Sequence, residues 1–287
     1  MKQIQWYPGH MAKTKRQIKE HVKLIDVVLE LVDARIPYSS QNPDLLSMIG
    51  KTPKIVLLNK ADLADDQELE RWISWYRNQG IPALKINANS GKGLNKILPT
   101  IKDLLQEKVD KELARGRTNR PFRAMIMGIP NVGKSTLINS IAGKKKLVTA
   151  NRPGVTRQTQ YIRVGTDFEL LDTPGILWPK FEDPEVAVKL ALTGAIKDQI
   201  LPKDDVVIAG FKYMDKYYSG RMEERYDISV DIDHILTIFD GIGRKRGCLL
   251  PGNEIDYDRV CDVFLNDLRG NRLGPITLDR VNDFVSV

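Results

Sequence analysis

The sequence predicts an α/β domain built on a mostly parallel sheet, followed by a smaller domain composed only of helices. Short apolar runs alternate with helical patterns through the first 175 residues, which is typical of doubly wound sheets. One of these runs leads through a glycine-rich turn directly into a helical pattern. After about residue 180 only helical patterns remain. We therefore expect the first domain to cover residues 1–180 and the helical domain to cover residues 181–287.

Five apolar runs are predicted to form buried strands, because runs of this kind are typical of parallel strands covered on both faces. The predicted strands are 24–32, 54–58, 83–86, 124–127 and 168–171. Helices are expected between them, at 66–78, 94–108 and 136–142. The highly charged segment 108–123, which contains Gly116 and Pro121, is expected to be a surface connection.

The helical domain is expected to begin where Asp183 can cap a helix that has Pro184 at its first position. Further helices are predicted at 205–218, 231–242 and 257–268. Cys248 and Cys261 stand in neither a CxxC motif nor a histidine-rich cluster. We therefore expect two buried thiols rather than a disulfide or a metal site.

The composition is ordinary for a globular protein, with 42% hydrophobic and 28% charged residues. No apolar run approaches the roughly 20 residues that cross a bilayer. The first residues also lack the apolar core of a signal peptide. We therefore expect a cytoplasmic protein that does not contact membranes, and we expect it to be a monomer. The net charge of +7 permits a polyanionic partner without requiring one.

The turn after the fourth predicted strand has the pattern GxxxxGK[ST], here GIPNVGKS at residues 128–135. A strand before it and a helix after it are the context that a phosphate-binding P-loop needs. Backbone N–H groups of the loop and the start of the helix can surround a diphosphate. Lys134 would neutralise the outer phosphates, and the Ser135 hydroxyl can bind Mg²⁺. The predicted phosphate-binding residues are Asn131, Val132, Gly133, Lys134, Ser135 and Thr136.

Two further features support a triphosphate site with a metal ion. Asp172, in the LLDTPG stretch at 170–175, can supply a carboxylate to the shell of Mg²⁺, and the backbone N–H of Gly175 can reach a γ-phosphate. Thr156 lies between this motif and the P-loop and can complete the metal site when a triphosphate is bound. Threonine is common after a Pro-Gly turn, so this assignment depends on its position between the two motifs.

Asn59-Lys60-Ala61-Asp62, directly after the second predicted strand, resembles the guanine-reading NKxD motif of the Ras-like GTPase superfamily. The Asp62 carboxylate can accept hydrogen bonds from N1–H and the exocyclic amine of guanine, whereas adenine has no donor at either place. Lys60 can lie along the face of the base. Asn87-Ala88 resembles the following motif, which is usually Ser-Ala, and Asn87 departs from it.

The order of these motifs predicts a circular permutation of the Ras-like domain. An ordinary GTPase has the P-loop first, whereas here the motifs occur in the order fourth, fifth, first, second, third (G4-G5-G1-G2-G3). Joining the old termini through segment 108–123 can preserve the sheet. The chain then enters the helical domain just after the segment that senses the γ-phosphate. Loss of that phosphate is therefore expected to reposition the helical domain.

The permuted order is accompanied by WYPGHMAK at 6–13, VDARIP at 32–37, GIPNVGKSTLIN at 128–139 and LLDTPGILWPKFED at 170–183. Together these stretches are similar to the bacterial ribosome biogenesis GTPase A family, the YlqF group of circularly permuted GTPases, over essentially the whole chain. The resemblance implies an enzyme that hydrolyses GTP to GDP and phosphate in late maturation of the large (50S) ribosomal subunit. It also implies that the enzyme binds ribosomal RNA and is stimulated by the particle.

Ras-like enzymes usually have a glutamine after DxxG that orients the attacking water, but Ile176 stands at that place here. The resemblance points to His10, in the amino-terminal loop, as the group that positions or activates the water. In the alternative interpretation residues 6–10 only pack the amino terminus onto the sheet. The predicted catalytic residues are His10, Lys134, Thr156 and Gly175.

Asn131 resembles the asparagine of potassium-activated GTPases, where it helps to hold K⁺ against the phosphates. The alternative is that it stabilises the turn. The predicted cofactors are accordingly Mg²⁺, bound by Ser135, Thr156 and Asp172, and K⁺ at Asn131. The expected partners are GTP or GDP and the large subunit, both its RNA and its proteins.

Two basic groups are candidates for RNA contact. At helical spacing Lys15, Arg16, Lys19 and Lys23 fall on one side of a helix over 11–23. Arg244, Lys245 and Arg246 follow one another at a helix end, where cations also complement the helix dipole. A solvated surface is the alternative for the first group. A regulatory GTP-binding switch that acts on a protein without RNA is the alternative function.

The roles of Asp33 and Arg35 in the VDARIP stretch stay open, because the two side chains can pair locally or meet the nucleotide.

Overall fold

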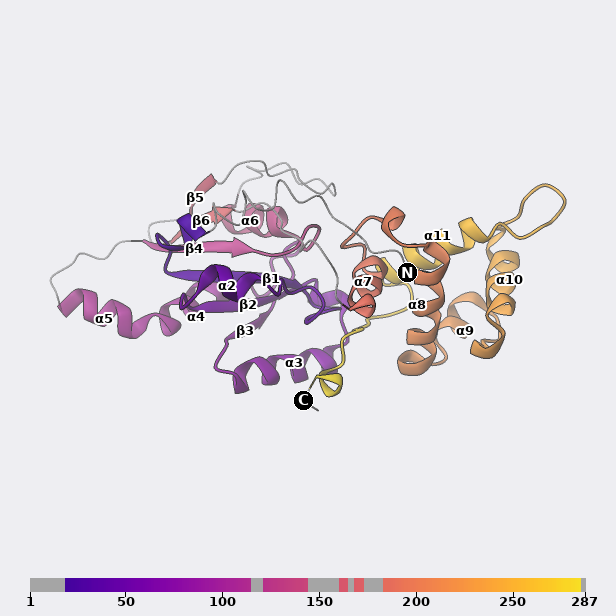
Figure 1. Ribbon diagram of the computed structural model, residues 1–287, viewed down its shortest axis with the longest axis horizontal. Helices are drawn as coiled ribbons and strands as arrows, with labels where there is room; N and C mark the ends of the chain where they lie inside the picture. Colours follow the sequence, from indigo (N-terminus) through magenta and orange to yellow (C-terminus); the bar gives the residue numbers. More distant parts are fainter. Residues whose placement is uncertain (1–18, 115–120, 144–159, 165–167, 173–182, 285–287) are drawn as a thin grey trace. The chain divides into compact units, whose positions relative to one another are not determined.

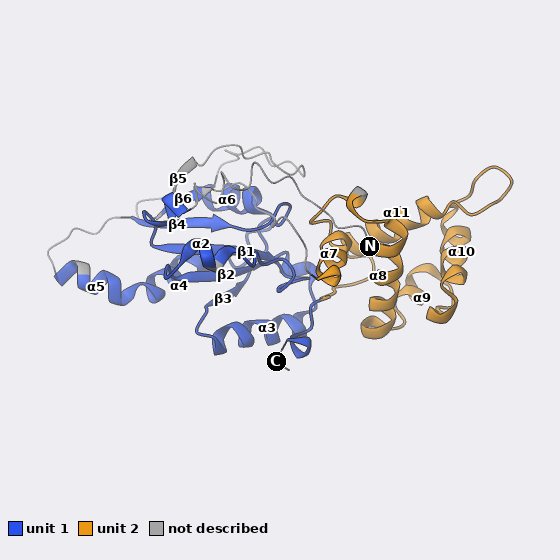
Figure 2. Cartoon of the chain, viewed as in Figure 1, with its two compact units in different colours: residues 1–182, 279–287 blue, residues 183–278 orange. Residues whose placement is uncertain are grey.

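A computed structural model describes residues 19–114, 121–143, 160–164, 168–172 and 183–284 of the 287-residue chain (Figure 1). The chain divides into two compact units, Met1–Glu182 with Asp279–Val287, and Asp183–Leu278 (Figure 2). The predicted helical domain, 181–287, therefore ends too late. The chain after Leu278 belongs to the first unit because its polar backbone groups are bound there. The indole Nε1 of Trp72 donates to the carbonyl of Asp279, and the Val281 N–H donates to Glu68.

The first unit is built around a six-stranded sheet, in which the strand order is β3-β2-β1-β4-β6-β5. All neighbouring strands are parallel except β5, which runs antiparallel to β6. The strands are β1 (Val27–Asp33), β2 (Lys54–Asn59), β3 (Ala83–Lys85), β4 (Phe122–Met127), β5 (Gln160–Val164) and β6 (Phe168–Asp172). The five predicted strands are confirmed, except that β1 begins three residues later than the predicted range of 24–32. The sequence of β5 contains no apolar run, so this edge strand was not predicted.

The central strands are buried because helices cover the sheet. Every residue of β1 is buried. On one face Val28 and Met125 pack with α2 (Leu45–Ile49), and Val32 and Leu58 pack with α3 (Asp66–Asn78). The predicted helix over 66–78 is confirmed. It begins there because the Asp65 side chain accepts hydrogen bonds from the N–H groups of the first turn.

The other helices of the first unit depart slightly from the predicted ranges. A single helix over 94–108 was expected, but this stretch contains the 3₁₀ turn η2 (Leu94–Lys96), α4 (Ile97–Leu104) and the start of α5 (Gln106–Ala114). The predicted surface connection 108–123 therefore begins as a helix. The P-loop helix α6 (Lys134–Ala142) lies beside β5 and β6. Two further 3₁₀ turns are η1 (Ala61–Leu63) and η5 (Val281–Asp283).

The second unit is helical in all of its described elements apart from one isolated bridge, between Leu249 and Ile255. Asp183 caps its first helix with Pro184 at the first position, as predicted. In the core, the ring of Phe211 packs edge to face against those of Phe239 and Phe264. The elements are α7 (Pro184–Leu192), η3 (Asp198–Ile200), α8 (Lys203–Tyr218), α9 (Arg221–Tyr226), η4 (Ile232–His234), α10 (Ile235–Arg246) and α11 (Tyr257–Arg269). The sequence did not predict α9.

Two expectations about single features can be compared with this structure. Cys248 and Cys261 are free and buried, as predicted, and burial raises the pKa of the Cys261 thiol to about 11. In the described part of the chain, no helix is both long enough and apolar enough to cross a membrane.

Candidate nucleotide-binding site

The nucleotide motifs follow strands that end at one edge of the sheet. NKAD begins at the last residue of β2, Asn87-Ala88 follows β3, and the P-loop follows β4. Asp172 ends β6, and the register places it beside Ile126, just before the P-loop. Strands β1 and β4 are neighbours at the point where the strand order reverses. Ligands of open α/β sheets bind outside the carboxyl ends of the strands at such a point.

Two glycines of the P-loop are required by close contacts. A Cβ on Gly133, which has a φ of 102°, would lie 2.5 Å from Nδ2 of Asn59. A Cβ on Gly128 would lie 2.5 Å from the carbonyl oxygen of Leu31. Both distances are far shorter than a van der Waals contact allows. The P-loop therefore approaches the ends of β1 and β2 so closely that only glycine fits at these positions.

Lys134 begins helix α6 and folds back over the loop that precedes it. Its ammonium donates to the carbonyl oxygens of Gly128, at 3.0 Å, and Ile129, at 2.8 Å. The residue is only 8% exposed. Ser135 and Thr136 follow it in the first turn of α6 and are half-buried. The P-loop lysine and its neighbouring hydroxyls are thus at the start of the helix, where the helix dipole favours phosphate.

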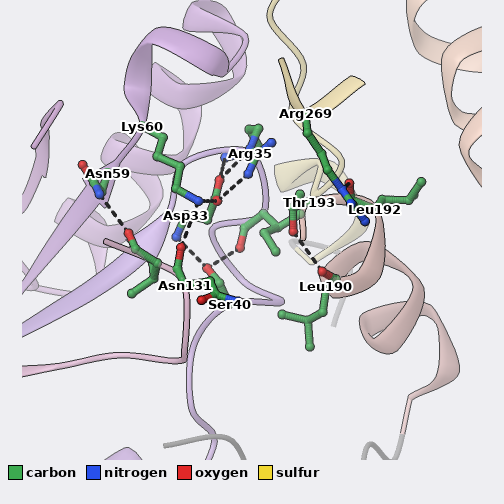
Figure 3. A network of polar contacts seen from close by, with 12 residues as sticks. Asp33, Arg35, Ser40, Asn59, Lys60, Asn131, Leu190, Leu192, Thr193 and Arg269 are labelled. Carbon is green, nitrogen blue, oxygen red and sulfur yellow. Dashed lines mark hydrogen bonds and ion pairs between the residues drawn. The ribbon is translucent and has the colours of Figure 1, made fainter. Parts of the chain in front are cut away.

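Asn59 connects the P-loop to the loop after β3. Its side-chain N–H group donates to the carbonyl oxygen of Val132, at 2.8 Å (Figure 3). Its side-chain oxygen accepts from the backbone N–H of Ala88, at 2.9 Å. The Ser140 hydroxyl, on α6, donates to the carbonyl oxygen of Ala88. One buried asparagine therefore holds three predicted motifs together.

Lys60 reaches the P-loop and the end of β1 at the same time. Its ammonium lies 2.9 Å from Oδ2 of Asp33 and 3.1 Å from the carbonyl oxygen of Asn131 (Figure 3). Asp33 is also paired with Arg35, through contacts of 2.9 Å and 2.7 Å. Asp33 and Arg35 therefore pair locally, which is one of the two alternatives left open by the sequence. The pair also includes Lys60 of the NKAD motif, a contact that the sequence did not predict.

The charges around Asp33 fix its ionisation. Burial would raise the pKa of this carboxyl group, but the neighbouring Arg35 and Lys60 outweigh burial and hold the pKa well below its usual range. Burial lowers the pKa of Arg35, but the Asp33 carboxylate, together with Asp62, more than offsets that effect and raises the pKa. An ionised Asp33 carboxylate therefore lies between two cations beside the phosphate loop, and the Asp62 carboxylate also acts on Arg35.

Asp62 and Asn87 occupy the two positions expected to meet the base. Asp62 is exposed at the start of η1, and Ala61 beside it is half-buried. The Asn87 side-chain oxygen accepts from the N–H groups of Asn89, at 2.9 Å, and Ser90, at 3.0 Å. The departure from serine at residue 87 thus has a local reason, because the longer amide closes the turn that presents Ala88.

Several predicted residues cannot be placed. His10, Lys15, Arg16, Thr156, Gly175 and Ile176 lie outside the described residues, and only the backbone of Asp172 is described. Of the first basic group, Lys19 and Lys23 are described and both are exposed.

The second basic group is exposed in the last turn of α10, but two of its members have other contacts. Lys245 pairs with Asp227. Arg246 donates to the carbonyl oxygen of Arg225 and lies 5.3 Å from the centre of the Tyr226 ring. These two side chains fasten α10 to the region of α9, so Arg244 is the member of the group least engaged among the described contacts.

Comparison with known proteins decides the family. The chain is 51% identical over 281 residues to ribosome biogenesis GTPase A of Bacillus cereus, covering 98% of this chain and 95% of that protein. The chain belongs to the ribosome biogenesis GTPase A family. Its relative from Thermotoga maritima is 30% identical over 285 residues, covering 99% of this chain and 97% of the relative. Family models described as "50S ribosome-binding GTPase" and "RsgA GTPase" match residues 123–245 and 45–182.

Solved structures of this family support the same fold. GNP-bound YlqF from Thermotoga maritima has a TM-score of 0.65 and 26% identity, covering 93% of this chain and 98% of that one. The GDP-bound structure of the same protein has a TM-score of 0.66 and covers 93% of this chain and 100% of that one. The predicted fold class, a circularly permuted Ras-like GTPase domain followed by a helical domain, is confirmed. As a member of the ribosome biogenesis GTPase A family, the chain is a GTP-hydrolysing enzyme of ribosome biogenesis.

Proposed function

We propose that this GTPase acts in late maturation of the large (50S) ribosomal subunit, binds ribosomal RNA and is stimulated by the particle. The proposal rests on the nucleotide site, which is supported by the connection that Asn59 makes between the guanine-reading loops and the P-loop. The match of residues 123–245 to a "50S ribosome-binding GTPase" model favours the large subunit. We also propose that the protein is cytoplasmic and acts as a monomer.

Guanine is the base that the proposed site selects. The exposed Asp62 carboxylate would accept hydrogen bonds from N1–H and the exocyclic amine of guanine. The stem of Lys60 would lie along the base, and the backbone of Asn87-Ala88 would approach its edge. The base-binding residues are thus Asn59, Lys60, Ala61, Asp62, Asn87 and Ala88.

The phosphates would be bound at the start of α6, by the backbone of 131–136 and by Lys134. Ser135, Thr156 and Asp172 offer hydroxyl and carboxylate oxygens, which are the ligands that Mg²⁺ prefers. The ion would neutralise charge on the phosphates during transfer. The amide oxygen of Asn131 would contribute to a K⁺ site, and Gly175 would bind the γ-phosphate through its backbone.

Hydrolysis requires a group that positions water, because Ile176 has no polar atom to do so. We assign this role to His10, brought to the γ-phosphate when the particle is bound. RNA phosphates would meet Lys15, Arg16, Lys19 and Lys23 and the basic end of α10, Arg244, Lys245 and Arg246.

Sedimentation with purified subunits tests the partner. The chain, bound to a non-hydrolysable GTP analogue, is mixed with large or small subunits at increasing KCl, and the bound fraction is measured. Salt-sensitive association with the large subunit alone is the expected result. Equal association with both subunits would contradict the proposed 50S role. Association with a protein but with neither subunit would favour the protein-directed switch.

A further inference from the structure

The end of β1 contains charged residues that no nucleotide motif accounts for. Asp33, the last residue of the strand, lies beside Asn59 in the parallel register and is 2% exposed. Arg35 is equally buried. A buried ion pair is costly to keep in a strand end unless further contacts make use of it. Here the third contact is with Lys60, a predicted base-binding residue.

We propose that Asp33 is a positioning residue of the guanine site, which holds the Lys60 ammonium against the P-loop carbonyl of Asn131. The inference rests on the proposed nucleotide site and adds to it a residue outside the motifs. Through this one lysine, Asp33 would fix the place of the base relative to the phosphates. The VDARIP stretch would therefore set the affinity for guanine nucleotides.

The backbone on both sides of the contact supports this role. Lys60 and Asn131 each have a φ of 59°, in the left-handed region that residues other than glycine adopt uncommonly. Such conformations persist where surrounding contacts hold them. The bond from the Lys60 ammonium to the carbonyl of Asn131 joins these two loops, and the carboxylate of Asp33 anchors the same ammonium to the end of β1. Without the Asp33 carboxylate, Lys60 would keep only the neutral carbonyl of Asn131 out of these two partners.

The carboxylate of Asp33 is itself held in one orientation. Arg35 binds it through Nε and Nη2, and the Arg35 backbone N–H donates to Oδ1 at 3.1 Å. The Asp33 backbone N–H donates to the Ser40 hydroxyl, which in turn donates to the carbonyl of Ile36. Two-point binding by arginine fixes the plane of a carboxylate. The oxygen that faces Lys60 is therefore preset before any nucleotide arrives.

The same strand offers a matched control. Glu30 is also 2% exposed and is paired with a lysine, Lys54, at 2.8 Å. Lys54 begins β2, whereas Lys60 follows its end, so this pair lies away from the nucleotide loops. Burial raises the pKa of Glu30, whereas the pKa of Asp33 is lowered overall. Glu30→Gln still removes the acidic partner of a buried lysine pair from β1, as Asp33→Asn does, without touching the proposed site.

The test measures the dissociation constant for GDP by fluorescence titration of the full chain. Asp33→Asn is expected to weaken GDP binding about tenfold or more, since a charge-assisted hydrogen bond is lost. Glu30→Gln is expected to change it less than about twofold. In a Lys60→Met background, adding Asp33→Asn should have almost no further effect, because Asp33 acts through Lys60. Equal and additive losses in both backgrounds would overturn the proposal.

Asp33→Asn leaves the Arg35 charge buried without its counter-ion, which can destabilise the fold. A second variant therefore separates a loss of binding from a loss of folding. The double variant D33N/R35M removes both charges and should show the same weakened binding. If it binds GDP as the wild-type chain does, the inference is wrong while the nucleotide site stands. If the wild-type chain fails to bind GDP, the proposed site and this inference are both wrong.

Discussion

Asp279 accepts hydrogen bonds from both the backbone N–H and the hydroxyl of Ser39, which lies 240 positions earlier in the chain. Asp279 is completely buried, and its carboxylate also accepts from the N–H of Tyr38. Nearby, Phe284 contacts the rings of Tyr38 and Trp72. The segment that follows the helical unit is therefore fastened to the loop that comes after β1, the strand that Asp33 ends.

This attachment should contribute measurably to the stability of the first unit. Asp279→Asn is expected to lower the free energy of unfolding by about 1.5–3 kcal/mol, because hydrogen bonds to a buried charged group are weakened. Tryptophan fluorescence in urea measures it selectively, since residues 183–278 contain no tryptophan. Asp283→Asn, at an exposed position of η5, serves as the control. Equal stability of the two variants would contradict the role given to Asp279.

A methyl group on Gly133 should strongly weaken nucleotide binding. The added Cβ would lie 2.5 Å from Nδ2 of Asn59 and would push the P-loop away from the guanine-reading loops. We expect GDP affinity to fall by about 100-fold or more, comparable to losing several hydrogen bonds. Gly143→Ala is the control, because it has a positive φ as well but nothing within 4 Å of the added Cβ. A Gly133→Ala chain that still binds GDP normally would show that the close approach is unnecessary.

Acid should weaken the second unit through Asp267. Burial would raise the pKa of this carboxyl group, but hydrogen bonds from Arg225 and Arg272 lower it. A pKa lowered on folding contributes stability above the unfolded pKa, and that contribution is lost as the pH falls. Thermal unfolding by far-UV circular dichroism should show Asp267→Asn less stable than wild type at pH 7, with the difference shrinking below about pH 4. A difference in stability between the variant and the wild type that does not change with pH would contradict this role of Asp267.

The three cations at the end of α10 should not be equivalent. Arg244→Ala should weaken binding to large subunits and reduce the slope of log affinity against log salt by about one, without loss of stability. Lys245→Ala should also destabilise the unit, because Lys245 pairs with Asp227. Sedimentation at several salt concentrations, beside thermal unfolding, separates the two effects. An unchanged salt slope for Arg244→Ala would remove this residue from the RNA surface.

Local signals explain which parts of the fold could be predicted. The α3 range was predicted to the residue because Asp65 provides a clear cap and apolar positions repeat at helical spacing. The parallel strands were found through their apolar runs. The edge strand β5 has no such run, and α9 is a single short helix, so neither has a strong local signal.

Contacts between distant residues explain most of what could not be predicted. Lys60 was expected along the base, but its ammonium also binds Asp33, 27 positions away, a pairing that no motif records. The return of Asp279 to Ser39 depends on burial and on the path of the whole chain. The P-loop and NKAD motifs, by contrast, are short local patterns that could be recognised in the sequence. The two motifs meet at Asn59, as expected for parts of one nucleotide site.

The rate of GTP hydrolysis with and without purified large subunits, in potassium buffer, tests the central claim most directly. We expect slow hydrolysis by the chain alone, since Ile176 cannot orient water, and a rise of about 100-fold or more with large subunits, within the range that a positioned acid–base group contributes. His10→Ala should remove that rise. Hydrolysis that large subunits leave unchanged would contradict a GTPase activated by the particle.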